Sequence, residues 1–519
     1  MNVAEVLRAR AEDMGHAPAI IDAARAVTFA QLERESARLA TQLARAGIAA
    51  GEPALVICPM SVDLYAVLIA LWRVGGLAMV LDPSAGLSHI DRCCRLVSPR
   101  AFAAVPKAHL LRVMSGALRR VPVRLAIGGW VPGARRLRPD IGDALDDIAA
   151  ADDQTPALLT FTSGSTGQPK AAIRTHGFLL AQHRVLAEDL HLRSGQRDLS
   201  TLPVFVLANL ASGVTSIIPE GDMRRPGQID PGPVLRQIRT LEPTRVAASP
   251  AFLDRLADHA ASLGQPIEQL AEIYTGGAPV FPGLLRRVRA AAPRARLVAV
   301  YGSTEAEPIA CIDWDEIAAA DVQAMETGAG LLTGRPVAAI RLRILHEQME
   351  RPLGTLSQSE LDQQTLPAGQ VGEIVVSGAH VLPGYLGGVG DAETKIQVGA
   401  TVWHRTGDAG YLDPSGRLWL LGRCSARIVD SHGVLYPFAV ECAAMTTAGV
   451  RRSALVSVAG RRVLAVELER TAGDVRTALL ASLAWAFIAD VIVVASLPVD
   501  RRHNAKIDYP ALRALVDRS

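Results

Sequence analysis

Apolar strand-like runs alternate with helical patterns along the first 150 residues of this 519-residue chain. The run PALVICP (53–59) has the length and composition of a buried strand, and SVDLYAVLIALWRVG (61–75) has those of a helix. LAMVLDP (77–83) then returns to a strand pattern. A strand, a helix and a second strand in succession predict a mainly parallel α/β sheet, because a helical crossover brings parallel strands side by side.

The alternation returns in residues 197–305. Strand-like DLSTLPVF (198–205) is followed by helical patterns such as AFLDRLADHAASLG (251–264) and by strands such as RLVAVYG (296–302). From about residue 325 the pattern changes to short strands and turns, which indicates an antiparallel or barrel-like layer.

The length exceeds that of one ordinary domain, so two or more folding units are expected. A compact α/β segment follows Arg423 and runs to the end of the sequence. We therefore predict a boundary at Gly422-Arg423, which divides a domain of residues 1–422 from one of residues 423–519.

Charge and cysteine content limit the partners and the compartment. The 54 basic and 52 acidic side chains nearly balance, so no whole-protein field attracts nucleic acid or an anionic membrane, and a negatively charged ligand must be held locally. Six scattered cysteines without metal-ligand spacing, and an N-terminus without an apolar core, favour a cytoplasmic setting. The apolar stretches 64–81 and 483–499 contain Arg73 and Asp490, so we expect buried elements rather than an integral membrane span.

The segment TFTSGSTGQPK (160–170) combines hydroxyls, glycines and one lysine after a strand-like run. Most clusters of this composition are simple turns. A phosphate cradle is the alternative, because glycines let backbone N–H groups approach a ligand closely and Lys170 supplies a positive charge. The spacing differs from the G-x-x-x-x-G-K-[ST] pattern, and the segment alone does not decide between these interpretations.

Four further segments favour the phosphate cradle. Together with TFTSGSTGQPK they make five motifs whose order along the chain resembles that of the acyl-adenylate-forming superfamily. This superfamily includes acyl-CoA ligases, luciferases and the adenylation domains of peptide synthetases. TFTSGSTGQPK resembles its phosphate loop, YTGGAPV (274–280) its adenine-binding turn and YGSTEAEP (301–308) the segment with its magnesium-binding glutamate. RTGDAGYLDPSGRLWLLGR (405–423) resembles its ribose-binding segment and hinge, and RRHNAKIDYPALR (501–513) the region of its catalytic lysine.

The resemblance implies a fold and a first reaction. The fold has a large N-terminal domain of two stacked, mainly parallel sheets with helices and a small distorted β-barrel, followed by a small mobile α/β C-terminal domain. The reaction is attack of a carboxylate on the α-phosphate of ATP, which releases pyrophosphate and leaves an acyl-AMP. Negative charge gathers at the α-phosphate in the transition state, so the site needs cations and N–H donors already in place.

The resemblance also assigns roles to individual residues. Lys506 and Thr304 would act at the reacting carboxylate and α-phosphate, and Glu305 would bind Mg²⁺, a hard cation that prefers oxygen ligands. Asp408 and Arg423 would hold the ribose. The expected phosphate-loop residues are Thr162, Ser163, Gly164, Ser165, Thr166, Gly167 and Lys170. The expected residues around the adenine are Gly276, Gly277, Ala278, Tyr301 and Gly302.

The segment PVFVLANLASGVTSIIP (203–219) departs from the usual form of the family, because it carries no charged residue and its first half is apolar apart from Asn209. Apolar side chains cannot satisfy the hydrogen bonds of a polar substrate, so this segment favours a fatty chain over an amino acid. The expected acyl-pocket residues are Phe205, Val206, Leu207, Asn209 and Leu210.

The hinge departs as well. Thioester-forming relatives usually carry an acidic or lysine residue two positions after the arginine, followed by a glycine-rich loop. Here Ser425 stands two positions after Arg423, and Gly433 is the single glycine of the region that follows. Together with HNAK at 503–506, this is most similar to the olefin-pathway β-lactone synthetases. In that chemistry the 3-hydroxyl of a long-chain 2-alkyl-3-hydroxy acid attacks its own activated carbonyl, and the tethered nucleophile gains a large effective molarity.

Three interpretations of the whole chain remain open. In the first, ATP and Mg²⁺ serve β-lactone formation from a lipid acid. In the second, a fatty acyl-CoA or acyl-carrier-protein ligase uses CoA or a carrier thiol, since a shared scaffold does not fix the second step. In the third, the chain is a non-catalytic module that binds nucleotide or fatty acid. The small-molecule lipid acid is the expected partner in each enzymatic case, alongside other enzymes of the same lipid pathway.

Overall fold

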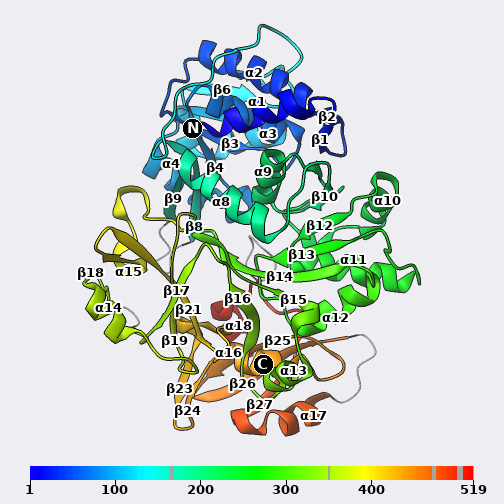
Figure 1. Cartoon of the computed structure of the whole chain (residues 1–519), viewed down its shortest axis with the longest axis vertical. Helices are drawn as coiled ribbons and strands as arrows, with labels where there is room; N and C mark the ends of the chain where they lie inside the picture. The colour runs from blue at the N-terminus through cyan, green and yellow to red at the C-terminus, as the bar shows by residue number, and fades with distance from the viewer. Residues whose placement is uncertain (164–168, 349–350, 470–474, 500–505, 518–519) are drawn as a thin grey trace. The chain divides into compact units, whose positions relative to one another are not determined.

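The computed structural model describes residues 1–163, 169–348, 351–469, 475–499 and 506–517 (Figure 1). The chain forms two compact units, each a mixture of helices and sheets. Unit 1 comprises Met1–Arg224, Gly232–Ala247 and Ala379–Asp391. Unit 2 comprises Arg225–Pro231, Ala248–Gly378 and Ala392–Ser519. The α/β fold class predicted from the alternating pattern is confirmed.

A seven-stranded sheet in unit 1 has the order β7-β6-β5-β3-β4-β8-β9. Its strands are β3 (Pro53–Ile57), β4 (Leu77–Val80), β5 (Ala101–Ala104), β6 (Val123–Ala126), β7 (Arg135–Arg136), β8 (Pro156–Ser163) and β9 (Pro169–Thr175). Every neighbouring pair is parallel except β8 and β9, which form an antiparallel hairpin. The parallel sheet predicted from the first 150 residues is therefore present.

Alternate residues of β3 belong to two different hydrophobic clusters. Ala54 and Val56 pack in the cluster that includes α2 (Phe29–Arg45) and α3 (Val62–Arg73), whereas Leu55 and Ile57 pack in the cluster that includes α4 (Leu87–Val97). Successive strand residues point to opposite faces, so both faces of this sheet are covered (Figure 1). This explains why β3 is an uninterrupted apolar run in the sequence.

A second group of strands in unit 1 has the order β12-β10-β11-β1-β2. Its strands are β1 (Pro18–Ile21), β2 (Ala26–Thr28), β10 (Arg197–Ser200), β11 (Thr215–Ile217) and β12 (Arg245–Ala248). The helices of this region are α1 (Val3–Met14), α8 (His176–Asp189), α9 (Pro203–Ser212) and α10 (Pro231–Leu241).

The prediction of a strand over residues 198–205 is correct only for its first half. Pro203 begins helix α9, and Gly213 ends it in the left-handed conformation with φ of 73°. Proline suits the first helical position, because its missing N–H would have no partner there. An apolar run that contains a proline start and a glycine stop is a buried helix here rather than a strand.

Unit 2 combines parallel strands with a larger antiparallel region. Strands β13 (Glu272–Gly276) and β14 (Arg296–Ser303) are parallel, with helices α11 (Pro250–Ser262) and α12 (Pro282–Ala291) beside them. The order continues as β14-β15-β16-β22-β21-β19-β17, and each neighbouring pair in it is antiparallel. These strands are β15 (Ala306–Asp313), β16 (Leu331–Pro336), β17 (Arg341–Leu345), β19 (Gly372–Ser377), β21 (Thr401–Leu412) and β22 (Leu418–Arg423). The antiparallel layer predicted beyond residue 325 is therefore present.

The segment after β22 forms its own small sheets within unit 2. A hairpin of β23 (Ile428–Asp430) and β24 (Gly433–Leu435) precedes helix α16 (Pro437–Ala444). Strands β25 (Val450–Val458), β26 (Arg461–Leu468) and β27 (Asp490–Val493) form a three-stranded sheet, followed by α18 (Tyr509–Val516). The domain boundary at Gly422-Arg423 stays a prediction.

Across the described residues, no helix combines the length and the apolar character needed to cross a bilayer. The apolar stretch 64–81 folds into most of α3 and all of β4. Arg73, at the end of α3, is buried and its guanidinium lies 2.5 Å from the Glu33 carboxylate.

Candidate active site

The predicted phosphate loop joins the two strands of the β8–β9 hairpin in unit 1. Thr162 and Lys170 are opposite each other in the antiparallel register, as are Ser163 and Pro169. The predicted loop residues Gly164, Ser165, Thr166 and Gly167 lie outside the described residues. The hairpin therefore places Thr162 and Lys170 at its tip, where the sequence predicts phosphate binding.

The segment Ala379–Asp391 passes over this end of the hairpin. Tyr385 forms a bridge with Ala172 of β9, and the Lys170 ammonium lies 5.5 Å from the centre of the Tyr385 ring. At Gly390, where φ is 94°, a Cβ atom would lie 2.6 Å from Lys170 Nζ. Only glycine lets the backbone come this close to the lysine. The cation–π contact and this close approach hold the Lys170 side chain at the hairpin tip.

The predicted adenine turn lies at the end of β13 in unit 2. Gly276 is the last residue of the strand and Gly277 follows with φ of 83°. On the neighbouring strand β14, Tyr301 and Gly302 occupy the end that leads into the turn with Thr304 and Glu305. The carboxyl ends of adjacent parallel strands meet at one edge of a sheet, which is where α/β proteins bind ligands.

Asp408 is the centre of a hydrogen-bonded cluster on three strands. It lies opposite Arg423 in the register of β21 and β22, and its Oδ1 is 3.3 Å from Arg423 Nε. The Tyr301 hydroxyl donates to Asp408 Oδ2 at 2.7 Å. Arg423 also donates to the Thr406 carbonyl at 2.7 Å. The predicted ribose residues and one predicted adenine residue thus form a single connected group.

Electrostatics within this cluster keep the Tyr301 phenol neutral and the Arg423 guanidinium charged. Burial and the neighbouring Asp408 carboxylate raise the pKa of Tyr301 well above its usual value, so the phenol stays protonated and donates its hydrogen bond. The Asp408 charge raises the pKa of Arg423. A fixed carboxylate between a phenol and a guanidinium can accept hydrogen bonds from a vicinal diol, as ribose recognition requires.

Lys506 lines a cavity of about 530 Å³ in unit 2, together with several of the residues predicted at the nucleotide. The segment after β27 carries it there, because Val499 forms an antiparallel bridge with Ile507 and the Asp508 amide donates to the Pro498 carbonyl. The predicted site residues that line this cavity are Gly277, Ala278, Tyr301, Gly302, Asp408, Arg423 and Lys506. The predicted catalytic lysine and the predicted nucleotide-binding residues therefore line the same cavity.

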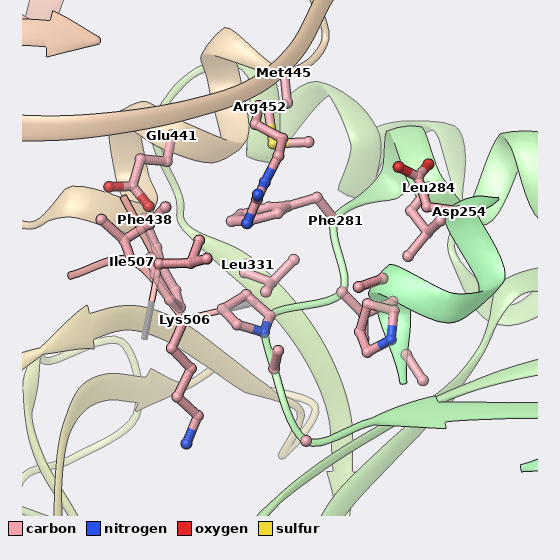
Figure 2. A pocket seen from close by; sticks show the side chains of 18 of the residues that line it. Asp254, Phe281, Leu284, Leu331, Phe438, Glu441, Met445, Arg452, Lys506 and Ile507 are labelled. Carbon is pink, nitrogen blue, oxygen red and sulfur yellow. The ribbon is translucent and has the colours of Figure 1, made fainter. Parts of the chain in front are cut away.

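The same cavity is lined by aromatic and charged groups that the sequence did not predict (Figure 2). Phe281 and Phe438 pack edge to face with ring centres 5.7 Å apart. Glu441, which is 1% exposed, accepts a hydrogen bond from the Tyr509 hydroxyl at 2.9 Å. Tyr509 lies three residues after Lys506, so this bond ties the lysine segment to helix α16. No local motif signals the pair, because its partners are 68 residues apart.

Gly276, Thr304 and Glu305 are not among the residues that line the cavity. Glu305 lies in the turn between β14 and β15, where its amide donates to Ser303 Oγ at 3.2 Å. The negative charge of Glu305 contributes to raising the pKa of Arg423. It also raises the pKa of His404, against the stronger effects that lower it. Burial, followed by the charge of Lys395, lowers the pKa of His404 to about 3, so the imidazole is neutral.

Within the described part of the chain, no group of three or more histidine, cysteine, aspartate or glutamate side chains could hold a metal ion. The chemistry of a single carboxylate nevertheless fits Mg²⁺, which commonly binds through one or two carboxylates and substrate phosphates. Glu305 is thus compatible with a metal that arrives with a nucleotide.

The residues predicted for the acyl pocket lie on helix α9. Val206 and Leu210 belong to the main hydrophobic core of unit 1, and Leu207 packs against that core while partly exposed. Asn209 is buried and donates to Asp198 at 2.7 Å and to Ser216 at 3.1 Å. Phe205 is also buried. Contact of these side chains with an acyl chain stays a prediction.

The predicted hinge residues follow strand β22. Arg423 is its last residue, and Ser425 lies exposed in the short 3₁₀ helix Cys424–Ala426. Burial raises the pKa of the Cys424 thiol beside them, which keeps it protonated and unreactive. The hinge role of Arg423 and Ser425 stays a prediction.

Comparisons with known proteins identify the family of this chain. The AMP-binding enzyme family matches residues 7–386. The chain is 34% identical over 503 residues to the olefin beta-lactone synthetase of Stenotrophomonas maltophilia, which covers 92% of this chain and 89% of that protein. It is 28% identical over 461 residues to a feruloyl-CoA synthase of an Amycolatopsis species, which covers 86% and 84%.

A solved structure superposes on nearly the whole chain. The amide bond synthetase McbA from Marinactinospora thermotolerans superposes with a TM-score of 0.81 and 24% identity, covering 99% of each chain. This likeness shows the fold, and the family match and the relative at 34% identity show the membership. The chain therefore belongs to the AMP-binding enzyme family and is an adenylate-forming ligase.

Proposed function

We propose that this ligase activates a long-chain 2-alkyl-3-hydroxy fatty acid as its acyl-AMP and then closes it to a β-lactone. The observation that carries the first step is the cavity in unit 2, which Lys506 lines together with Tyr301, Asp408 and Arg423. The second step is supported by the relatives named olefin beta-lactone synthetase, one from Stenotrophomonas maltophilia and one from Xanthomonas campestris, each 34% identical.

In the first step, Asp408 and Arg423 would hold the ribose hydroxyls, and Gly277 and Ala278 would frame the adenine. Lys506 would place its ammonium at the reacting carboxylate and α-phosphate. One carboxylate oxygen attacks the α-phosphorus, and the bond from that phosphorus to the β-phosphate oxygen breaks to release pyrophosphate. A cation fixed at the α-phosphate stabilises the charge that builds there, and it does so most strongly in a site that excludes water.

Thr162 and Lys170 would contact the β- and γ-phosphates from the hairpin tip of unit 1. The contact of Lys170 with the Tyr385 ring supports this role, because it reduces the freedom that the side chain would lose on binding phosphate. Glu305 would hold Mg²⁺, which neutralises phosphate charge when bound, and Thr304 would contact the α-phosphate.

In the second step, the 3-hydroxyl oxygen of the substrate attacks the activated carbonyl carbon. The hydroxyl proton is lost, the bond from the carbonyl carbon to the AMP oxygen breaks, and AMP leaves. The product is lighter than the starting acid by one water. The nucleophile belongs to the substrate itself, so no thiol channel is needed, and Ser425 with a single Gly433 at the hinge is consistent with that.

The test is incubation of the full chain with ATP, Mg²⁺ and a 2-alkyl-3-hydroxy fatty acid, with and without CoA, followed by mass spectrometry. The proposal predicts AMP, pyrophosphate and a product lighter by one water in both reactions. A matched acid without the 3-hydroxyl serves as the control and should stop at the acyl-AMP. A thioester that forms only with CoA, without the lighter product, would instead identify an acyl-CoA ligase.

A further inference from the structure

One segment of the chain is strongly basic, although the net charge of the whole chain is small. Residues 101–139 contain eight lysine and arginine residues and no aspartate or glutamate. This segment runs from β5 through the short helices α5 (Pro106–His109), α6 (Leu111–Met114) and α7 (Gly116–Arg120) to the edge strand β7. The exposed members of the basic set are Lys107, Arg119, Arg120, Arg135, Arg136 and Arg138.

Large apolar side chains are exposed within the same segment. Leu110 is 65% exposed, Val113 is 73% exposed and Met114 is 68% exposed. They are spaced i, i+3 and i+4 along a continuous helical stretch, so they share one face of it. Trp130, which is 72% exposed, lies in the loop after β6. Exposing four large apolar groups to water is costly for a surface that has no partner.

The Trp130 loop lies along the helical stretch. A Cβ atom on Gly129 would be 2.7 Å from the side chain of Pro106, and one on Gly133 would be 3.9 Å from the Arg112 guanidinium. The apolar helical face and Trp130 are thus parts of one surface, at the end of the seven-stranded sheet where β7 is the edge. We call the exposed side chains of Leu110, Val113, Met114 and Trp130 the apolar tip.

Acidic groups from neighbouring elements leave most of this positive charge uncompensated. Asp91 on α4 accepts a hydrogen bond from Ser115, and Asp140 lies 3.8 Å from Arg138 in a pair whose side chains are 49% and 68% exposed. An exposed pair of this kind contributes little. Lys107 and Arg135, which flank the apolar tip in the sequence, have no acidic partner among the ion pairs of the described residues.

We infer that this surface docks the protein on an anionic lipid bilayer. A tryptophan and aliphatic side chains inside a basic field match the interface of such a bilayer, where apolar groups enter the boundary of the acyl region and cations meet lipid phosphates. Charge complementarity selects lipid as the occupant, because exposed basic side chains precede and follow the apolar tip within the same segment. The inference is independent of the proposed second step.

The test is co-sedimentation of the full chain with vesicles of phosphatidylglycerol and with vesicles of phosphatidylcholine, at low and high salt. We expect binding to phosphatidylglycerol that weakens at high salt, and much weaker binding to phosphatidylcholine. The double variant Lys107→Gln/Arg135→Gln should bind about 25-fold more weakly, from roughly fivefold per basic residue at the surface. The matched control Arg286→Gln/Arg294→Gln removes the same charge from exposed positions of unit 2 and should bind as the wild type does.

Vesicles containing brominated acyl chains test insertion directly. They should quench a component of the tryptophan fluorescence that is missing in Trp130→Phe. Retention of the quenched component in Trp130→Phe would overturn the assignment of the apolar tip. Failure to bind phosphatidylglycerol vesicles, or equal losses in the two charge variants, would overturn the inference as a whole. Thermal unfolding of each variant should match the wild type, because the changed side chains are exposed.

Discussion

Replacing Glu441 by glutamine should change how the stability of unit 2 depends on pH. Glu441 is 1% exposed on helix α16, and its Oε1 accepts hydrogen bonds from the Leu455 amide at 3.0 Å and from the Tyr509 hydroxyl at 2.9 Å. Burial raises the pKa of this carboxyl from 4.5 to about 7, although both hydrogen bonds oppose the shift. The folded state therefore holds the proton more tightly than the unfolded state does.

The sign and size of the effect follow from this difference. The stabilising contribution is fully present below pH 4.5, where both states are protonated, and is lost as the pH rises towards and through 7. At roughly 1.4 kcal/mol per pH unit, the loss amounts to about 3 kcal/mol. Glutamine cannot ionise, and its carbonyl oxygen can accept the same two hydrogen bonds. Glu441→Gln should thus match the wild type near pH 4.5 and exceed its stability by up to about 3 kcal/mol at pH 8.

Urea unfolding of both proteins at pH 5, 6, 7 and 8 measures this difference. The variant Tyr509→Phe is the matched control, because it keeps the carboxyl and removes a hydrogen bond that lowers its pKa. In that control the loss of stability should move to higher pH rather than disappear. Parallel pH profiles for wild type and Glu441→Gln would refute the assignment of a buried, neutral Glu441.

Three other substitutions have defined outcomes. Lys506→Ala should slow acid-dependent ATP–pyrophosphate exchange by about 10²–10³-fold while circular dichroism stays unchanged, as expected for a group that stabilises transition-state charge; a normal exchange rate would exclude Lys506 from catalysis. Glu305→Gln should raise the Mg²⁺ concentration needed for half-maximal exchange, and an unchanged Mg²⁺ titration would refute its role. Glu373→Gln should destabilise the protein by about 3–5 kcal/mol in denaturant, because it leaves the buried Arg405 without its charged partner; a shift under 1 kcal/mol would show that the pair is dispensable.

The local sequence pattern predicts the helices and strands whose limits are set by residues close to them in the sequence. Strand β3 and helix α3 were predictable because their apolar runs end at glycine or proline, and the parallel sheet followed from their alternation. Residues 203–205 were predicted as strand because a short apolar run fits both states. Pro203 and Gly213 bound the helix, and burial of Val206 and Leu210 in the core of unit 1 stabilises it.

In the candidate site, too, local motifs identify some residues, whereas others depend on contacts between distant parts of the sequence. Motifs identify Asp408, Arg423 and Tyr301, and the hydrogen bond from Tyr301 to Asp408 joins residues that lie 107 apart in the sequence. Glu441 was not identified, because its meaning depends on burial and on Tyr509, which only the folded chain supplies. Long-range pairs of this kind carry no local signature.

The most direct test of the central claim is ATP–pyrophosphate exchange by the purified full chain with a series of long-chain 3-hydroxy acids. The account predicts exchange that requires both the acid and Mg²⁺, together with an acyl-AMP detectable by mass spectrometry. The absence of exchange with every lipid acid of the series would contradict adenylation of a lipid acid at this site.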